Sequence, residues 1–209
     1  NILGKISELS GKAYHPDDVN TKAFRIVADH MRTATFILGD PRGVSPSNVD
    51  QGYILRRLIR RAVRYGMGLG LQAGFTCEIA KVIIDQYKDV YPELTENAGF
   101  VLEQLKLEED RFARTLRQGE KEFEKIYNNI SNTRALLDSI LDADNKAAFA
   151  AELAQQKKLR PSPDMMPIID AANAGDDAAV EAAVKARLET LNTMDGRSAF
   201  KLYDTYGFP

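Results

Sequence analysis

Residues 44–66 read VSPSNVDQGYILRRLIRRAVRYG, and this stretch decides the fold class. Turn-forming residues come first, followed by apolar residues that recur every three or four positions, as on a helix. On a helical wheel the five arginines fall within one arc of about 140°, opposite the apolar residues. No aspartate or glutamate lies between Gly52 and Gly66. We therefore expect a helix with one apolar face and one uniformly positive face. The arginines are Arg56, Arg57, Arg60, Arg61 and Arg64.

The same periodicity extends over most of the chain and predicts an all-α protein, a helical bundle with one long amphipathic helix. Turn residues are dense at 39–46 (GDPRGVSP), which we expect to be a loop, and a second break is expected at 158–167 (KLRPSPDMMP). The expected helices are 2–10, about 20–38, 52–66, 76–91, and a long one from about 96 to 130.

Residues 131–196 differ from the rest, since they are rich in alanine and acids and contain Phe149 as their single aromatic residue. We expect helices at about 134–157 and 167–192, the second of them a helical pair with a turn near Gly175. This segment is interpreted as an Ala-rich helical insertion. The predicted organisation is a bundle at 1–130, the insertion at 131–196 and a return segment at 197–209.

Composition limits the possible functions. The 209 residues have a net charge of −2, so any nucleic-acid surface must be a local patch. The single cysteine, Cys77, excludes an internal disulfide and fits a reducing, cytoplasmic compartment. His15, His30 and Cys77 are too widely spaced for a typical zinc site. No apolar run approaches the roughly 20 residues that span a bilayer, so no membrane contact is expected. The two ends suggest a segment of a longer protein.

The arginine face has two interpretations. Its side chains could pair with acids on a neighbouring helix, of which Glu103, Glu108, Glu109 and Asp110 are the candidates. However, like charges four residues apart on a helix repel each other by a few tenths of a kcal/mol per pair. Arginine also presents a planar fork of donors that suits phosphate oxygens. The pattern favours a nucleic-acid backbone, and we expect about two of the five arginines to pair internally.

Four segments carry a family resemblance. FRIVADHMRTATFILGD, GVSPSNVDQGYILRRLIRRAVRYG, EEDRFARTLRQGEKEF and AFKLYDTYGFP resemble the alanyl-tRNA synthetases, in the order in which that family has them. The resemblance covers about 1–127 and 197–209. It implies the helical tRNA-recognition region that follows the class II catalytic core.

The resemblance also implies a function, namely recognition of a G·U wobble pair in the acceptor stem of tRNA(Ala). The family's readers are an Asn in the PSN turn and the Asp of LYDTYGFP, which here are Asn48 and Asp204. An RNA duplex exposes base edges and 2′-hydroxyl groups in its shallow minor groove, where such side chains can probe them. The five helix arginines would hold phosphates and position the duplex without reading its sequence. DNA is not an expected partner.

Both readers also have simpler interpretations. Asn48 could be the N-cap of the following helix, and Asp204 could cap a turn. The chain also departs from the family pattern, because Asp50-Gln51 stands where the family commonly has Gly-Arg. The preceding loop also contains Pro41-Arg42, which the family usually lacks. Arg42 could replace the positive charge that is lost with the arginine of Gly-Arg.

Whether this chain is itself an enzyme stays open. It lacks the class II motifs that bind ATP and alanine and the zinc ligands of the editing domain, so ATP, Mg²⁺ and Zn²⁺ are implied only for the parent ligase. Its expected protein partners are the parent's catalytic and editing domains. The alternative is a helical protein–protein interaction module that docks an acidic partner. A stand-alone hydrolase has no supporting Ser/His/Asp or carboxylate constellation.

Overall fold

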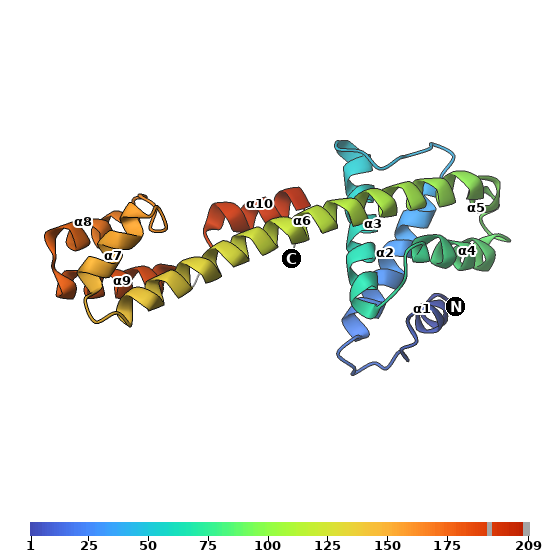
Figure 1. Ribbon diagram of the computed structural model, residues 1–209. Helices are drawn as coiled ribbons and strands as arrows, with labels where there is room; N and C mark the ends of the chain where they lie inside the picture. The colour runs from blue at the N-terminus through green and yellow to red at the C-terminus, as the bar shows by residue number, and fades with distance from the viewer. Residues whose placement is uncertain (192–193, 207–209) are drawn as a thin grey trace. The chain divides into compact units, whose positions relative to one another are not determined.

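The computed structural model describes residues 1–191 and 194–206, and these residues form α-helices without any β-strand. The predicted all-α class is confirmed. The chain divides into two compact units, Asn1–Thr115 and Leu116–Pro209, and the boundary falls within one long helix, α6 (Figure 1).

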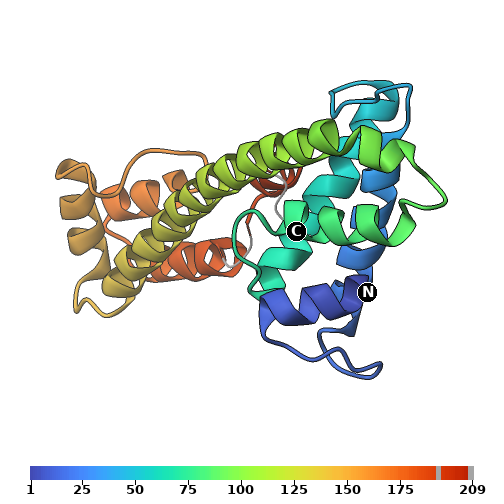
Figure 2. The same ribbon diagram turned by 90° about the vertical axis from the view of Figure 1, so that its right-hand side faces the viewer.

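The first unit is built around two helices that run alongside each other, α2 and α3 (Figures 1 and 2). Its core contains the fully buried side chains of Phe24, Met31, Leu55, Ile59 and Leu105. The apolar arc predicted for the arginine-rich helix therefore faces the core. The helices of this unit are α1 (Ile2–Ser10), α2 (Thr21–Gly39), α3 (Asp50–Leu69), α4 (Phe75–Tyr87), α5 (Glu93–Glu96) and the start of α6 (Ala98–Leu141).

Helix α3 is longer than predicted, because it continues through Gly66 to Leu69, where Gly70 is the C-cap with a φ of 90°. Gly66 is buried, and a Cβ at this position would lie within 3.0 Å of the Phe75 ring. The glycine therefore lets α4 approach α3 and is not a helix stop. Helix α4 ends at Tyr87, earlier than the predicted residue 91.

The second unit surrounds the end of α6, where Leu137 and Ile140 are fully buried against the alanine-rich helices. These helices are α7 (Lys146–Gln155), α8 (Met166–Ala174) and α9 (Asp177–Leu191), and the unit also contains α10 (Gly196–Tyr206). Within this unit α10 lies beside α6, and Lys201 Nζ is 3.0 Å from Glu122 Oε1.

The prediction of one helix over 134–157 is wrong, because α6 ends at Leu141 and α7 begins at Lys146. Asn145 caps α7 by accepting a hydrogen bond from the Ala148 N–H at 2.8 Å. Asp177 accepts a further one from the Ala147 N–H at 2.7 Å. These two acceptors satisfy backbone donors at the start of α7 and stabilise the break. The predicted helical pair is confirmed, since α8 ends at Gly175 with a φ of 71°.

Candidate nucleic-acid interface

The Ser-Pro-Ser-Asn turn folds back onto the first turn of α3. The Ser47 N–H donates to the Gly52 carbonyl oxygen at 3.0 Å, and the Ser47 hydroxyl donates to the Val49 carbonyl oxygen at 2.8 Å. Gly52 is buried, and a Cβ there would lie within 3.0 Å of both Ser47 and Ser45. The absence of a side chain at Gly52 is what allows the turn to lie against the helix.

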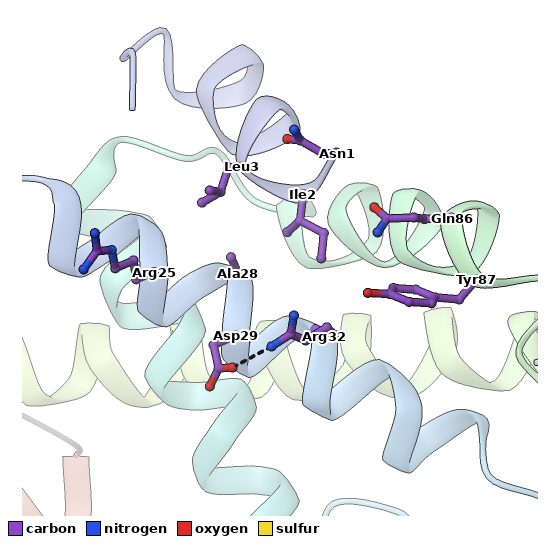
Figure 3. Close-up of a pocket in the computed structure, with 9 residues that line it drawn as sticks. All are labelled: Asn1, Ile2, Leu3, Arg25, Ala28, Asp29, Arg32, Gln86 and Tyr87. Carbon is purple, nitrogen blue, oxygen red and sulfur yellow. Dashed lines mark hydrogen bonds and ion pairs between the residues drawn. The ribbon is translucent and has the colours of Figure 1, made fainter. Parts of the chain in front are cut away.

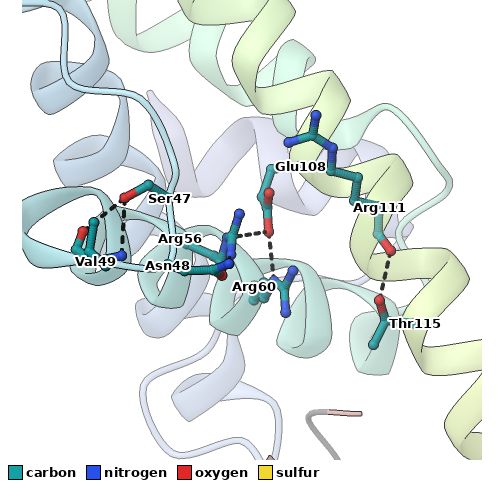
Figure 4. A network of polar contacts seen from close by, with 8 residues as sticks. All are labelled: Ser47, Asn48, Val49, Arg56, Arg60, Glu108, Arg111 and Thr115. Carbon is teal, nitrogen blue, oxygen red and sulfur yellow. Dashed lines mark hydrogen bonds and ion pairs between the residues drawn. The ribbon is translucent and has the colours of Figure 1, made fainter. Parts of the chain in front are cut away.

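Asn48 is exposed at the tip of this turn and does not cap the helix. The N-cap of α3 is Val49, which makes no side-chain cap bond, so the N-cap interpretation of Asn48 is wrong. Instead, Arg56 Nη1 donates a hydrogen bond to Asn48 Oδ1 (Figure 4). The predicted reader is therefore held by one of the predicted phosphate-binding arginines.

The arginine face divides into an inner and an outer set. Arg56 and Arg60 form the inner set and share Glu108 of α6, which is 1% exposed. Arg60 Nε donates to Glu108 Oε1 at 2.6 Å, and Arg56 Nε lies 3.4 Å from the same oxygen. The Arg60 guanidinium also lies 5.2 Å from the centre of the Phe112 ring, one turn further along α6. Two of the five arginines thus pair with an internal acid, the number predicted from the sequence.

Arg57, Arg61 and Arg64 form the outer set. Arg57 and Arg61 are exposed and Arg64 is half-buried. Arg57 lies over the Tyr53 ring at 5.7 Å, whereas Arg61 and Arg64 lie 5.9 and 5.5 Å from the centre of the Tyr65 ring. Among residues 1–191 and 194–206, no carboxylate forms an ion pair with these three. Their charges are therefore available to an external anion.

Arg42 is exposed but already paired. Its Nε and Nη2 donate to the two carboxylate oxygens of Asp40 at 2.9 and 3.0 Å, and its backbone N–H donates to the same group at 2.9 Å. These hydrogen bonds from Arg42 lower the pKa of Asp40 to about 2. The charge that Arg42 adds to the loop is consequently balanced by its neighbour.

Asp50 has a φ of 49°, in the left-handed region that residues other than glycine rarely adopt. Aspartate is among the few side chains that tolerate this conformation. Asp50 and Gln51 are exposed and, with Ser47, line a shallow hollow beside the turn. Asp50 thus adds a negative charge at the edge of the candidate interface.

Asp204 lies in the second unit, in the last turn of α10, and its side chain is exposed. It forms neither a hydrogen bond nor an ion pair with the described residues. The interpretation of Asp204 as a turn cap is not supported, because the residue is helical. The final residues of its motif, 207–209, lie outside the described residues. The proximity of Asp204 to Asn48 stays a prediction, since the two belong to different units.

A second hollow, of about 370 Å³, lies between α1, α2 and α4 (Figure 3). It is lined by apolar groups and by Arg25, Asp29 and Arg32, and Arg32 donates to Asp29 at 3.0 Å. No predicted site residue lines it.

The remaining chemistry of the described residues is sparse. No group of three or more His, Cys, Asp or Glu side chains is arranged there to hold a metal ion. Burial raises the pKa of the Cys77 thiol, which disfavours the reactive thiolate. Over the same part of the chain, none of the helices combines the length and apolarity needed to cross a membrane.

Sequence reasoning missed two contributors to the interface. Gly52 is predicted only as part of a motif, although a glycine in the first turn of a helix can indicate close backbone approach. Ser47 supplies the hydroxyl that closes the turn. Glu108 is one of the four acids predicted as partners of the arginines, and the structure selects it from among them.

Comparisons with known proteins agree with these motifs. The family described as "tRNA synthetases class II (A)" matches residues 1–144. The chain is 49% identical over 125 residues to an alanine–tRNA ligase of Treponema pallidum, a match that covers 60% of this chain and 21% of the relative. It is 39% identical over 155 residues to that of Borreliella afzelii, covering 74% of this chain and 26% of the relative.

A third alanine–tRNA ligase, from Halalkalibacterium halodurans, is 33% identical over 208 residues, which cover 100% of this chain and 17% of the relative. The match of residues 1–144 to the family model places the chain among class II tRNA synthetases. Together with the relatives, it shows that the chain belongs to the alanyl-tRNA synthetase family. The chain spans between 17% and 26% of the length of these three relatives.

Proposed function

We propose that this chain is the acceptor-stem recognition region of an ATP-dependent alanine–tRNA ligase. In this proposal the outer arginines, with Arg42, hold phosphates of the tRNA(Ala) acceptor stem. Asn48 and Asp204 test the G·U pair from the minor groove. Alanine activation with ATP and Mg²⁺, and zinc-dependent editing, are assigned to other parts of the parent protein. Catalysis by this chain alone is not proposed.

The observation that carries the proposal is the positive charge of Arg57, Arg61 and Arg64 on the helix that follows Asn48, where none of the three forms an ion pair with a described carboxylate. Guanidinium groups that are not engaged by a carboxylate bind phosphate oxygens strongly, because the geometry allows two parallel hydrogen bonds. Arg56 and Arg60 keep a predicted role at phosphates as well. Each guanidinium carries five N–H donors, and the pair with Glu108 occupies only some of them.

The roles of the two readers follow from their hydrogen-bonding groups. An ionised aspartate only accepts, so Asp204 suits a donor such as the free amino group of guanine in a wobble pair. Asn48 can provide the complementary group. A site built to bond a particular polar group discriminates strongly against its absence, since the site's own groups are then left unpaired.

The test is fluorescence anisotropy of a labelled acceptor-stem minihelix, with a G·U or a G·C pair, titrated with the 209-residue chain over a series of salt concentrations. We expect a preference for G·U and a fall in affinity of more than about tenfold between 50 and 200 mM salt. Arg61→Ala should weaken both RNAs equally and reduce the salt slope by about one. The matched control is Arg160→Ala, another exposed arginine, in the second unit.

Salt-sensitive binding without a G·U preference would contradict the role of Asn48 and Asp204 in reading the base pair. It would still support phosphate binding by the arginines. No binding at low salt would overturn the proposal in favour of a protein-interaction module. For such a module an acidic protein partner should give a shallower salt dependence.

A further inference from the structure

The first unit buries two consecutive carboxylates of α6, Glu108 and Glu109, which are 1% and 5% exposed. A buried carboxylate is costly because it leaves water, and it is tolerated only when it is paired or hydrogen-bonded. Each of the two therefore needs a specific explanation.

Glu109 has a structural explanation. One of its oxygens accepts from the Gly74 N–H at 2.7 Å, and the other accepts from the Thr76 hydroxyl. These groups belong to the N-terminal end of α4, which begins at Phe75. A negative charge at this position satisfies free backbone donors and interacts favourably with the helix dipole. Glu109 thus anchors α4 to α6.

Glu108 is engaged differently. Its Oε1 accepts a hydrogen bond from Arg60 Nε and forms an ion pair with Arg56 Nε at 3.4 Å, without a hydrogen bond to Arg56. Its Oε2 is buried without a hydrogen-bond partner among the described residues, whereas both oxygens of Glu109 accept hydrogen bonds. Glu108 also differs from Glu109 because its partner Arg56 hydrogen-bonds a second residue, Asn48.

Arg56 links the buried carboxylate to the exposed turn. Its Nε lies 3.4 Å from Glu108 Oε1, and its Nη1 donates to Asn48 Oδ1 (Figure 4). The Arg56 side chain is 17% exposed, so it is confined between α3 and α6. The ion pair with Glu108 and the confinement between two helices restrict this guanidinium, and because the group is planar and rigid its Nη donors then point in a restricted direction.

The hydrogen bond from Arg56 determines which way the side-chain amide of Asn48 is turned. A guanidinium can only donate hydrogen bonds, so the oxygen of Asn48 must face Arg56. The Nδ2 amino group must then point away from Arg56. Asn48 itself is exposed, and among residues 1–191 and 194–206 Arg56 is the one hydrogen-bond partner of its side chain.

We propose that Glu108 is a positioning residue for Asn48: through Arg56 it fixes the amide so that its N–H donors face the ligand. The inference deepens the proposed function and rests on it for its biological meaning. Its physical content concerns the free chain and can be tested without RNA.

The first test is NMR of the free 209-residue chain with ¹⁵N-labelled asparagine side chains. In the wild type we expect the Asn48 amide to have an order parameter near the rigid-backbone value of about 0.85. Glu108→Gln removes the charge that holds Arg56 and should lower the Asn48 value below about 0.6. Glu109→Gln is the matched control, because it neutralises the adjacent buried carboxylate. It should leave the Asn48 order parameter unchanged and alter the Gly74 amide resonance.

A second variant tests the inference even if Glu108→Gln does not fold. Arg56→Lys keeps a positive charge for Glu108 but lacks the second arm that reaches Asn48, so it should loosen Asn48 with Glu108 still paired. An Asn48 amide that stays as ordered in Arg56→Lys as in the wild type would overturn the inference.

The RNA readout then connects the inference to recognition. In Glu108→Gln and Arg56→Lys the ratio of G·U to G·C affinity should fall by about tenfold, the loss expected for one charge-assisted hydrogen bond. Glu109→Gln should preserve the ratio. A wild-type chain without a G·U preference would contradict the proposed function, and the order parameters would still decide whether Glu108 positions Asn48. Unchanged discrimination in both variants, in a chain that does discriminate, would overturn the positioning role.

Discussion

The Ser47 N–H donates to the Gly52 carbonyl oxygen at 3.0 Å, and this bond closes the reader turn onto the start of α3. A Cβ on Gly52 would lie within 3.0 Å of Ser47 and of the Ser45 carbonyl. The turn and the helix can therefore meet only when position 52 is a glycine. This contact, more than the sequence of the turn, determines where Asn48 lies.

Gly52→Ala should consequently displace the turn. We expect a loss of unfolding free energy of about 1–3 kcal/mol, the usual result of inserting a methyl group into a packed contact. The measurement is urea unfolding followed by circular dichroism. Gly68→Ala is the matched control, because a Cβ added to Gly68 of α3 would meet no atom within 4 Å. That variant should stabilise the chain by up to about 1 kcal/mol through higher helix propensity. Equal stability of the two variants would contradict the role of Gly52.

The backbone at Asp50 leads to a second prediction. Its φ of 49° is tolerated by aspartate and glycine but strained for alanine. We expect Asp50→Gly to unfold at a higher urea concentration than Asp50→Ala, by about 1 kcal/mol in unfolding free energy. Asp50→Gly also removes a negative charge from the hollow beside Asn48 and should tighten RNA binding at low salt. If the alanine variant is as stable as the glycine variant, this backbone conformation is not maintained in solution.

The sequence predicted the elements of the first unit well, because their apolar periodicity is regular and their ends carry glycines or caps. It also predicted that part of the arginine face pairs internally. It could not assign Arg56 and Arg60 to this role, since a helical wheel gives the face of one helix but not the position of the next. The burial of Glu108 and Glu109 was equally hidden. Both stand in a charged EED run, and only the packing of α3 and α4 against α6 removes them from water.

The second unit shows the limit of periodicity in alanine-rich sequence. Alanine favours helix everywhere and marks no face strongly, so the break between Leu141 and Lys146 escaped prediction. The sequence did carry a local sign of it in Asn145, a strong N-cap residue. Asp177, which completes the cap, is 30 residues from Ala147, whose N–H donates to it, and becomes a partner only through the fold.

The Asp40–Arg42 pair predicts a pH dependence. The pKa of Asp40 is lowered from 3.8 to about 2 by hydrogen bonds from Arg42. Because the folded-state pKa lies below the unfolded one, the pair's contribution to stability is present above the ordinary pKa and is lost as pH falls through about 2. Arg42→Ala should return the Asp40 pKa toward 3.8, which carboxyl ¹³C NMR titration can measure. Arg42 is exposed and Asp40 is partly exposed, so the effect on overall stability should be small. An Asp40 pKa that is unchanged in the variant would contradict this pairing.

Arg57 and Arg61 should act additively, because Arg57 lies over Tyr53 whereas Arg61 lies over Tyr65, and neither forms an ion pair with an acid of the described residues. Arg57→Ala and Arg61→Ala should each lower the salt slope by about one, and the double variant by about two. Minihelix binding at several salt concentrations measures the slopes. Arg60→Ala should differ, since it also leaves Glu108 short of a partner and so should reduce the unfolding free energy. Equal effects of Arg60→Ala and Arg61→Ala on stability would contradict the division of the face into two sets.

The orientation of Asn48 predicts which group of the base pair each reader contacts. With its oxygen facing Arg56, Asn48 offers N–H donors, so its target must be an acceptor such as a base O2 or a 2′-hydroxyl. The guanine amino group, a donor, is then left to Asp204. Replacing guanine with inosine removes only that amino group. Inosine should therefore weaken binding by the same factor in the wild type and in Asn48→Ala, but by no further amount in Asp204→Ala. Anisotropy with each combination of variant and RNA measures this coupling. If the inosine effect disappears in Asn48→Ala instead, Asn48 contacts the amino group through its oxygen, and Arg56 must release it when RNA binds.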